Sequence, residues 1–201
     1  MNKNIVIGGS VVVVLILAFF FATAGSEGEV DRAAAFGDVA IEGAPLPRLE
    51  DPSIDGSVGT PAPVVTGVDL DGNDMTIGVV DTPTIMVFLA HWCSHCQAEV
   101  SRLSPWLAEN ELDGVDLVAI ATSSSAEAPN FPPKAWLERD GWEVPTLLDD
   151  EDASAGAAYG LTFFPFWVVL DDDGTVAGRF TGEVSLEQFA AIVEQAAQLG
   201  G

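Results

Sequence analysis

The residues best suited to chemistry in this sequence are its two cysteines, Cys93 and Cys96, which form a C-x-x-C motif. They close too short a loop for a disulfide to stabilise the fold much, because the entropy removed from the unfolded chain falls with loop length. A structural zinc site normally uses a second pair of ligands, and no Cys or His follows Cys96. The spacing favours redox chemistry instead, in which two thiols are exchanged for one disulfide.

A strand and a helix are predicted on either side of the motif. Residues 84–90 form an apolar run with β-branched and aromatic members, which is typical of a strand buried on both faces. After the motif, apolar residues recur at helical spacing, namely Cys96, Val100, Leu103 and Leu107. Cys93 then begins a helix, where unpaired N–H groups and the helix dipole stabilise a thiolate. We expect Cys93 to be the exposed nucleophile and Cys96 to resolve the mixed disulfide.

Three residues next to the cysteines have side chains that could influence them. A protonated His95 would add a second favourable interaction to the Cys93 thiolate, and a more stable reduced form makes the couple more oxidising. Trp92 is expected to shield one side of the pair, with ordinary packing as the alternative. His91 is expected to pack or to face solvent rather than to take part in catalysis.

The rest of the pattern predicts an α/β domain. Strand-like and helical segments alternate in the middle of the chain, which indicates a parallel core. The last third favours an antiparallel hairpin around residues 171–174, where Gly174 tolerates positive φ, and the capping-box pattern at Ser185 predicts a final helix. The predicted strands are 64–65 and 75–77 around a turn at 71–73, then 84–90, 115–121, 146–148, 166–170 and 175–180, and the predicted helices follow Cys96, cover 132–140 and begin after Ser185.

The N-terminal residues predict a location outside the cytoplasm. Residues 5–24 are uncharged and apolar, and about 20 residues of helix are enough to cross a hydrocarbon layer about 30 Å thick. Lys3 precedes this run and acidic residues follow it, which favours a cytoplasmic N-terminus and an exported domain. We expect residues 1–25 to form a retained single-pass membrane anchor. The small residues at 22–24 leave a cleaved signal segment, and hence a secreted domain, as the alternative.

The remainder of the chain divides into a linker and a domain. Residues 26–57 are rich in Gly, Ala, Pro and acidic residues without a sustained apolar period, so they are predicted to be an acidic flexible linker. Residues 58–201 are predicted to be the folded domain. The formal net charge of −24, with only 7 Lys and Arg residues, makes nucleic acid a poor partner, because phosphate binding needs clustered basic side chains.

Several short motifs occur together in this chain. They are Pro61-Ala62-Pro63-Val64, Asp69-Leu70-Asp71-Gly72, Trp92-Cys93-Ser94-His95-Cys96 after a buried strand, and Tyr159-Gly160-Leu161-Thr162-Phe163-Phe164-Pro165 before another strand. In this order and spacing they resemble the thioredoxin superfamily, specifically its membrane-anchored TlpA/ResA-like branch, over roughly residues 58–199. The resemblance implies a thioredoxin-like fold, with a central mixed sheet flanked by helices after an N-terminal transmembrane helix. It also implies exchange with protein thiols or disulfides without a cofactor or metal, and a membrane or extracytoplasmic redox partner.

The same resemblance assigns Pro165 as the family's cis-proline, which lies beside the disulfide and leaves the backbone of Phe164 free to pair with an extended substrate. By itself the sequence shows only a proline at the start of an apolar strand, which an edge strand also tolerates. The aromatic residues at 163–167 are expected either to dock hydrophobic segments or to be buried in the sheet. Two features depart from the family. Val87 stands where many members have a buried acid, and Ser94-His95 replaces the Gly-Pro or Glu-Pro of typical reductases.

Together these features predict an extracytoplasmic thiol-disulfide oxidoreductase that acts on protein substrates through the Cys-Ser-His-Cys motif. The histidine of this motif is shared with the oxidant DsbA, whose potential of about −120 mV reflects a stabilised reduced form. Oxidation or isomerisation is therefore favoured over the reduction that serves cytochrome maturation. The alternative is a copper(I) chaperone, in which the same cysteines, with His91 or His95, hold a soft metal. A peroxidase is a third hypothesis.

Overall fold

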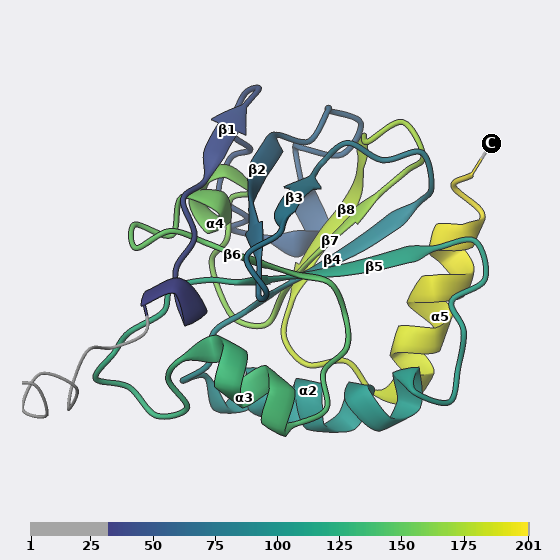
Figure 1. Ribbon diagram of the computed structural model, residues 1–201. Coiled ribbons are helices and arrows are strands. Elements are labelled where there is room, and N and C mark those ends of the chain that lie inside the picture. Colours follow the sequence, from purple (N-terminus) through teal and green to yellow (C-terminus); the bar gives the residue numbers. More distant parts are fainter. Residues whose placement is uncertain (1–31, 201) are drawn as a thin grey trace, which may run out of the picture. The chain divides into compact units, whose positions relative to one another are not determined.

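The computed structural model describes residues 32–200, which are built around one mixed sheet (Figure 1). The strands are β1 (Ala40–Glu42), β2 (Val64–Asp69), β3 (Asp74–Ile77), β4 (Thr84–Leu89), β5 (Asp116–Ala121), β6 (Thr146–Leu148), β7 (Phe166–Leu170) and β8 (Val176–Thr181). They follow the order β1-β2-β6-β5-β4-β7-β8, and β3 pairs with β2. β4 pairs in parallel with β5 and antiparallel with β7, so the strand that leads into the C-x-x-C motif is central.

The strand pairing confirms the predicted mixed α/β fold. The parallel pairs join β4, β5 and β6, whereas β7 and β8 form the expected antiparallel hairpin. All six residues of β4 are buried, because neighbouring strands lie on both of its edges and side chains cover both of its faces. This burial fixes the end of β4 and therefore the position at which the motif begins.

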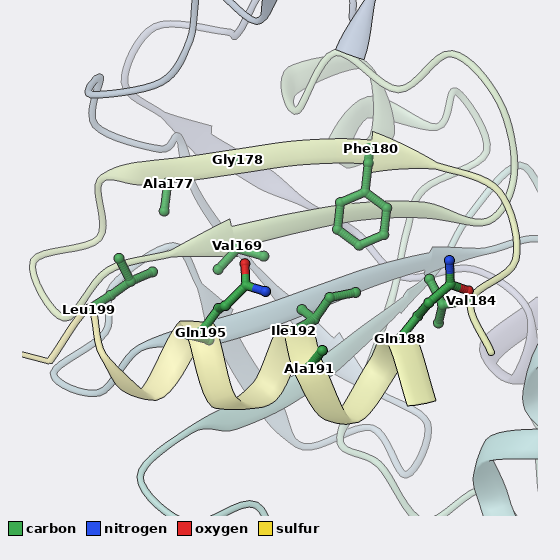
Figure 2. Close-up of a pocket in the computed structure, with 11 residues that line it drawn as sticks. Val169, Ala177, Gly178, Phe180, Val184, Gln188, Ala191, Ile192, Gln195 and Leu199 are labelled. Atoms are coloured by element: carbon green, nitrogen blue, oxygen red, sulfur yellow. The ribbon is translucent and has the colours of Figure 1, made fainter. Parts of the chain in front are cut away.

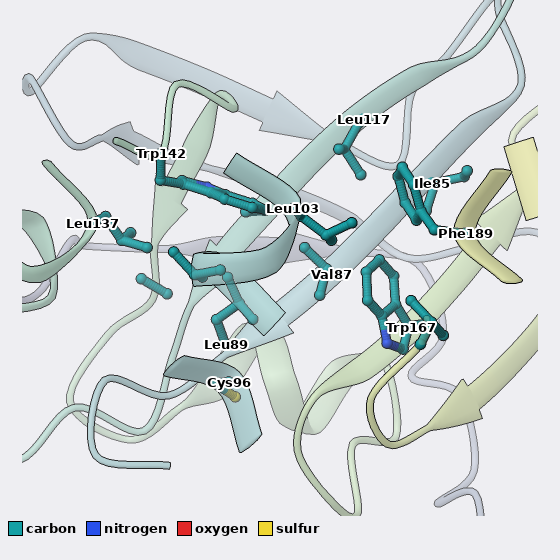
Figure 3. Packing of buried hydrophobic residues seen from close by; sticks show 14 of the residues in the cluster. Ile85, Val87, Leu89, Cys96, Leu103, Leu117, Leu137, Trp142, Trp167 and Phe189 are labelled. Carbon is teal, nitrogen blue, oxygen red and sulfur yellow. The ribbon is translucent and has the colours of Figure 1, made fainter. Parts of the chain in front are cut away.

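Helices and irregular segments cover the two faces of the sheet. The α-helices are α2 (Ser94–Leu107), α3 (Pro133–Arg139), α4 (Ser154–Ala158) and α5 (Leu186–Ala197), and two 3-10 turns cover Arg32–Ala34 and Pro52–Ile54. Val87 and its same-face neighbours pack with α2, α3 and α5 (Figure 3), whereas Phe88 packs on the other face with α4 and Tyr159. Successive residues of β4 therefore contribute to two separate clusters, as expected for alternating side chains. The short helix α4 was not predicted from the sequence.

The final helix begins where the sequence predicted. The Ser185 hydroxyl accepts a hydrogen bond from the Gln188 N–H, and the Gln188 side chain accepts one from the Ser185 N–H, so the capping box is complete. Phe189 lies fully buried on the inner face of α5. Between α5 and β8 runs an open, mostly apolar groove of about 560 Å³ (Figure 2), and none of the residues that line it belongs to the C-x-x-C motif.

The prediction of a flexible linker over residues 26–57 is wrong for residues 32–57. β1 pairs antiparallel with β2, and the side chains of Leu46 and Leu49 are buried in the cluster that contains Phe88. Burial of each leucine stabilises the fold by about 1.5–3 kcal/mol. Asp55 forms a buried ion pair with Arg179 of β8. These contacts are few and irregularly spaced, so they leave no periodic pattern in the sequence, yet they make this segment part of the domain.

The predicted anchor of residues 1–25 and the first residues of the predicted linker lie outside the described residues. Among the helices of residues 32–200, none combines the length and the apolar character that crossing a bilayer demands.

Candidate active site

The two cysteines lie where the central strand gives way to a helix, as predicted. Ala90, His91 and Trp92 follow β4, and Cys93 occupies the N-cap position of α2. The Cys93 side chain makes no capping hydrogen bond, so its sulfur remains available for chemistry. Cys93 is partly exposed, Cys96 is buried, and both are free thiols. A partly exposed sulfur at a helix N-terminus with a buried sulfur one turn later fits the roles of nucleophile and resolving thiol.

Cys96 lies at the edge of the main hydrophobic cluster (Figure 3). Its sulfur accepts a hydrogen bond from the Ala90 N–H at 3.4 Å. Burial raises the pKa of the Cys96 thiol well above its ordinary range, and the hydrogen bond from Ala90 opposes this effect only in part. Cys96 is therefore a neutral thiol at physiological pH and must give up a proton before it attacks a disulfide.

The loop before β7 meets the motif, and its proline is the cis-proline that the family resemblance implied. The Phe164–Pro165 peptide bond is cis, and Pro165 is buried. Pro165 immediately precedes Phe166, which pairs with Phe88 of β4. The Trp92 ring packs edge-on against the Phe164 ring, with 5.7 Å between the ring centroids. The structure thus places Phe164 against Trp92, the residue before Cys93.

His95 has an acidic partner that the sequence did not predict. Its ring nitrogen Nδ1 lies 2.6 Å from Oε1 of Glu183, on the loop between β8 and α5. The other carboxylate oxygen of Glu183 accepts a hydrogen bond from Arg102 at 3.2 Å. One ring nitrogen of His95 is therefore engaged with a carboxylate. The sequence carried no signal for this pairing, because the two residues are 88 positions apart.

His91 is buried and has a structural role, in line with the expectation that it packs. Its Nε2 accepts a hydrogen bond from the Ser125 N–H at 3.0 Å, so Nδ1 carries the proton and donates to the Pro129 carbonyl at 2.7 Å. Burial lowers the pKa of His91, which favours this neutral form. The Trp92 indole N–H also donates to the Ser123 carbonyl at 2.7 Å. These bonds fix the loop after β5 beside the motif.

Sequence reasoning missed Glu99, a fully buried acid one turn beyond Cys96. Its Oε2 accepts hydrogen bonds from the Arg102 side chain and the Val184 N–H, each at 2.9 Å. Its Oε1 has no hydrogen-bond partner. Burial raises the pKa of Glu99, and its charge is one of the smaller factors that raise the pKa of Cys96. The available signal was an acidic residue beside Val100 on the apolar face of the predicted helix.

No group of three or more His, Cys, Asp and Glu side chains in residues 32–200 is arranged to hold a metal ion. Cys93 and Cys96 offer two sulfur ligands, while His91 and His95 are engaged with other partners.

A C-x-x-C pair at the start of the helix after a central strand, next to a cis-proline loop, defines a thioredoxin-like thiol-disulfide oxidoreductase. The chain belongs to the Redoxin family, whose model matches residues 57–195. It is accordingly a protein-disulfide oxidoreductase.

Solved structures share the fold of this chain. A thiol:disulfide interchange protein from Chlorobium tepidum is 26% identical with a TM-score of 0.57, and the match covers 69% of this chain and 97% of that one. A secreted Mycobacterium tuberculosis disulfide oxidoreductase homologous to E. coli DsbE is 24% identical with a TM-score of 0.53 and coverage of 65% and 94%. StoA from Bacillus subtilis is 19% identical with a TM-score of 0.54 and coverage of 71% and 99%.

Proposed function

We propose that this chain exchanges disulfides with extended segments of protein substrates through Cys93 and Cys96. The observation that carries the proposal is the pairing of a partly exposed Cys93 with a buried Cys96 next to the cis Phe164–Pro165 loop. The copper(I) alternative has no specific observation in its favour among the described residues.

The exchange proceeds in two balanced steps. The Cys93 thiolate attacks one sulfur of a substrate disulfide, which forms a mixed disulfide and releases the other substrate sulfur as a thiolate. Cys96 then loses its proton and attacks the Cys93 sulfur, which forms the Cys93–Cys96 disulfide and releases the second substrate thiolate. The substrate gains two electrons and the enzyme loses two. In the reverse direction a substrate thiolate attacks the Cys93 sulfur of the oxidised enzyme, which forms the mixed disulfide and releases Cys96 as a thiolate that takes up a proton. A second substrate thiolate then attacks the substrate sulfur of the mixed disulfide, which forms the substrate disulfide and releases the Cys93 thiolate.

Trapping of the mixed disulfide tests this mechanism. A Cys96→Ala variant retains the nucleophile but cannot release the partner, so it should accumulate covalent complexes with client proteins in an exporting cell. Non-reducing electrophoresis and mass spectrometry would identify them, and a Cys93→Ala variant is the matched control that should trap none. If Cys96→Ala forms no covalent complex, or if the reduced wild type retains copper(I) tightly and does not catalyse insulin reduction or refolding, the proposal is wrong.

An apolar surface beside Cys93 is the proposed docking site for the substrate. It consists of Trp92, Phe163 and Phe164, and Phe163 is 70% exposed. Exposed aromatic side chains of this size are available to pack against apolar side chains of an extended chain, while the backbone of Phe164 pairs with it. Glutathione is too small to cover this surface and Cys93 at the same time.

Substitution Phe163→Ser should raise the KM for a reduced or oxidised protein substrate about tenfold, since it removes an apolar contact worth about 1–2 kcal/mol. Steady-state turnover of insulin would report the change, and turnover of glutathione should stay unchanged. The matched control is Val79→Ser, because Val79 is 67% exposed but follows β3, outside the proposed docking site. Equal effects of the two substitutions would rule out docking at Phe163.

We further propose that the domain works outside the cytoplasm, tethered by residues 5–24, where a membrane or extracytoplasmic redox partner resets the cysteine pair. The support is the uncharged apolar run with Lys3 before it and acidic residues after it. Protease added to intact spheroplasts should digest the domain and spare a cytoplasmic marker, and the full-length chain should sediment with membranes. Protection of the domain would refute the topology, and a shortened soluble form would indicate cleavage.

A further inference from the structure

Glu183 contacts both the exposed histidine of the motif, His95, and Arg102, which lies further along α2. Its two carboxylate oxygens contact two side chains of the same helix, His95 at 2.6 Å and Arg102 at 3.2 Å. These two residues are seven positions apart, so they lie on one face of α2. The hydrogen bond from His95, and then that from Arg102, holds the pKa of Glu183 below its usual range, so the carboxylate is ionised at neutral pH.

The remaining contacts of Arg102 keep it in place independently of Glu183. Its Nη2 donates to Glu99 and its Nε donates to the Val184 carbonyl at 3.0 Å. From the solvent inward the charged groups therefore alternate in sign, as His95, Glu183, Arg102 and Glu99. If Glu183 lost its charge, Arg102 would remain fixed, whereas His95 would lose its anionic partner. The position of the imidazole is thus the property of the site that depends most on Glu183.

This pairing changes what a protonated His95 does to Cys93. An imidazolium bound to a carboxylate presents little net charge to a third group, because the two opposite charges largely cancel a few ångströms away. The His95 side chain is largely exposed, so the ion pair itself contributes little to stability. Its main consequence is electrostatic, because the pairing reduces the positive charge that a protonated His95 presents to the Cys93 sulfur.

We propose that Glu183 is a positioning residue that holds His95 away from the Cys93 thiolate and thereby makes the cysteine pair less oxidising than its Ser94-His95 dipeptide alone would. The proposal rests on the thiol-disulfide exchange proposed above. On this proposal, a histidine between the two cysteines does not by itself make the chain a strong oxidant. Nothing in the sequence around the motif carries this information, since Glu183 lies beyond β8.

The test is the reactivity of Cys93 in Glu183→Gln, which keeps an oxygen acceptor for Arg102 but removes the charge. At pH 6.0, alkylation of Cys93 by iodoacetamide should be about threefold faster than in the wild type. The equilibrium with glutathione at pH 7.0 should shift towards the reduced enzyme, because the Cys93 thiolate would be more stable than in the wild type. Glu187→Gln makes the same change in net charge in the first turn of α5 and should leave both quantities unchanged.

A second pair of variants shows whether the effect passes through His95. On a His95→Gln background, Glu183→Gln should lose at least half of its effect on alkylation, because there is no imidazole to release. An effect of equal size in both backgrounds, no difference from Glu187→Gln, or slower alkylation would overturn the proposal. Failure of the exchange function itself would be recognised separately, because wild-type protein would then not equilibrate with glutathione although Cys93 would still be alkylated.

Discussion

Replacement of Asp55 by asparagine is expected to lower the free energy of unfolding by about 3–5 kcal/mol, because it leaves a buried guanidinium without its counter-ion. The side chains of Arg179 and Asp55 are only 1% and 4% exposed, and the shorter of their contacts is 2.6 Å. Arg179 also donates to the carbonyls of Pro47 and Tyr159 and to the Ser57 hydroxyl. The side chain of Arg179 thus holds residues 47–57 against the end of α4. Urea unfolding followed by tryptophan fluorescence would measure the loss.

The matched control for this prediction is Glu50→Gln. The Arg48–Glu50 pair is 3.6 Å long and its side chains are 68% and 81% exposed, so its loss should cost less than about 1 kcal/mol. The hydrogen bond from Arg179 lowers the pKa of Asp55 below 3.8 in the folded chain. The stabilisation that the ionised Asp55 gives to the fold is therefore present above pH 3.8 and is lost as the pH falls through the lowered pKa. The difference between wild type and Asp55→Asn should shrink in that range, and a loss independent of pH would contradict the ion-pair explanation.

Most of the fold could be predicted from the sequence because its central elements carry regular patterns. The uninterrupted apolar run of β4, the helical spacing after Cys96 and the capping box at Ser185 each occur within a few residues. The cysteine pair could be placed for the same reason, since strand, motif and helix are contiguous in the chain. Local patterns of this kind determine where a segment is buried and where a helix begins.

The parts that could not be predicted depend on contacts between distant segments. Leu46 and Leu49 are buried because their backbone N–H groups donate to the carbonyls of Ala158 and Gly160, more than 100 residues away. Gly160 has φ +73°, and a Cβ there would collide with the Pro47 carbonyl, so the close approach requires glycine. The composition of this segment resembles that of a linker, and only the tertiary contacts distinguish the two. The pairing of His95 with Glu183 escaped prediction for the same reason.

The second large effect is expected at Glu99, which we propose accepts the proton that Cys96 must lose in the resolving step. Burial makes Cys96 a neutral thiol, and the carboxylate of Glu99 lies one helical turn away with one buried oxygen free of hydrogen bonds. General base catalysis typically contributes about 10²–10⁴-fold to a rate, so Glu99→Gln should slow release of the substrate about a hundredfold. The rate of the attack by Cys93 should be unchanged, because this attack comes before the step in which Cys96 loses its proton.

The consequence is a mixed disulfide that accumulates in the variant, which acid quenching and mass spectrometry of single turnovers would detect. Burial raises the pKa of Glu99 above 4.5, so the wild-type resolving rate should fall as the pH drops through that pKa, and the variant should lack this dependence.

The variant should also remain folded. Burial favours the protonated carboxyl of Glu99, so the stabilisation that this group gives to the fold is present at low pH and is lost as the pH rises through the raised pKa. Glu99→Gln should therefore remain folded at pH 7. Glu109→Gln, which alters an exposed acid just beyond α2, is the control, and equal resolving rates in Glu99→Gln and the wild type would exclude Glu99 as the proton acceptor.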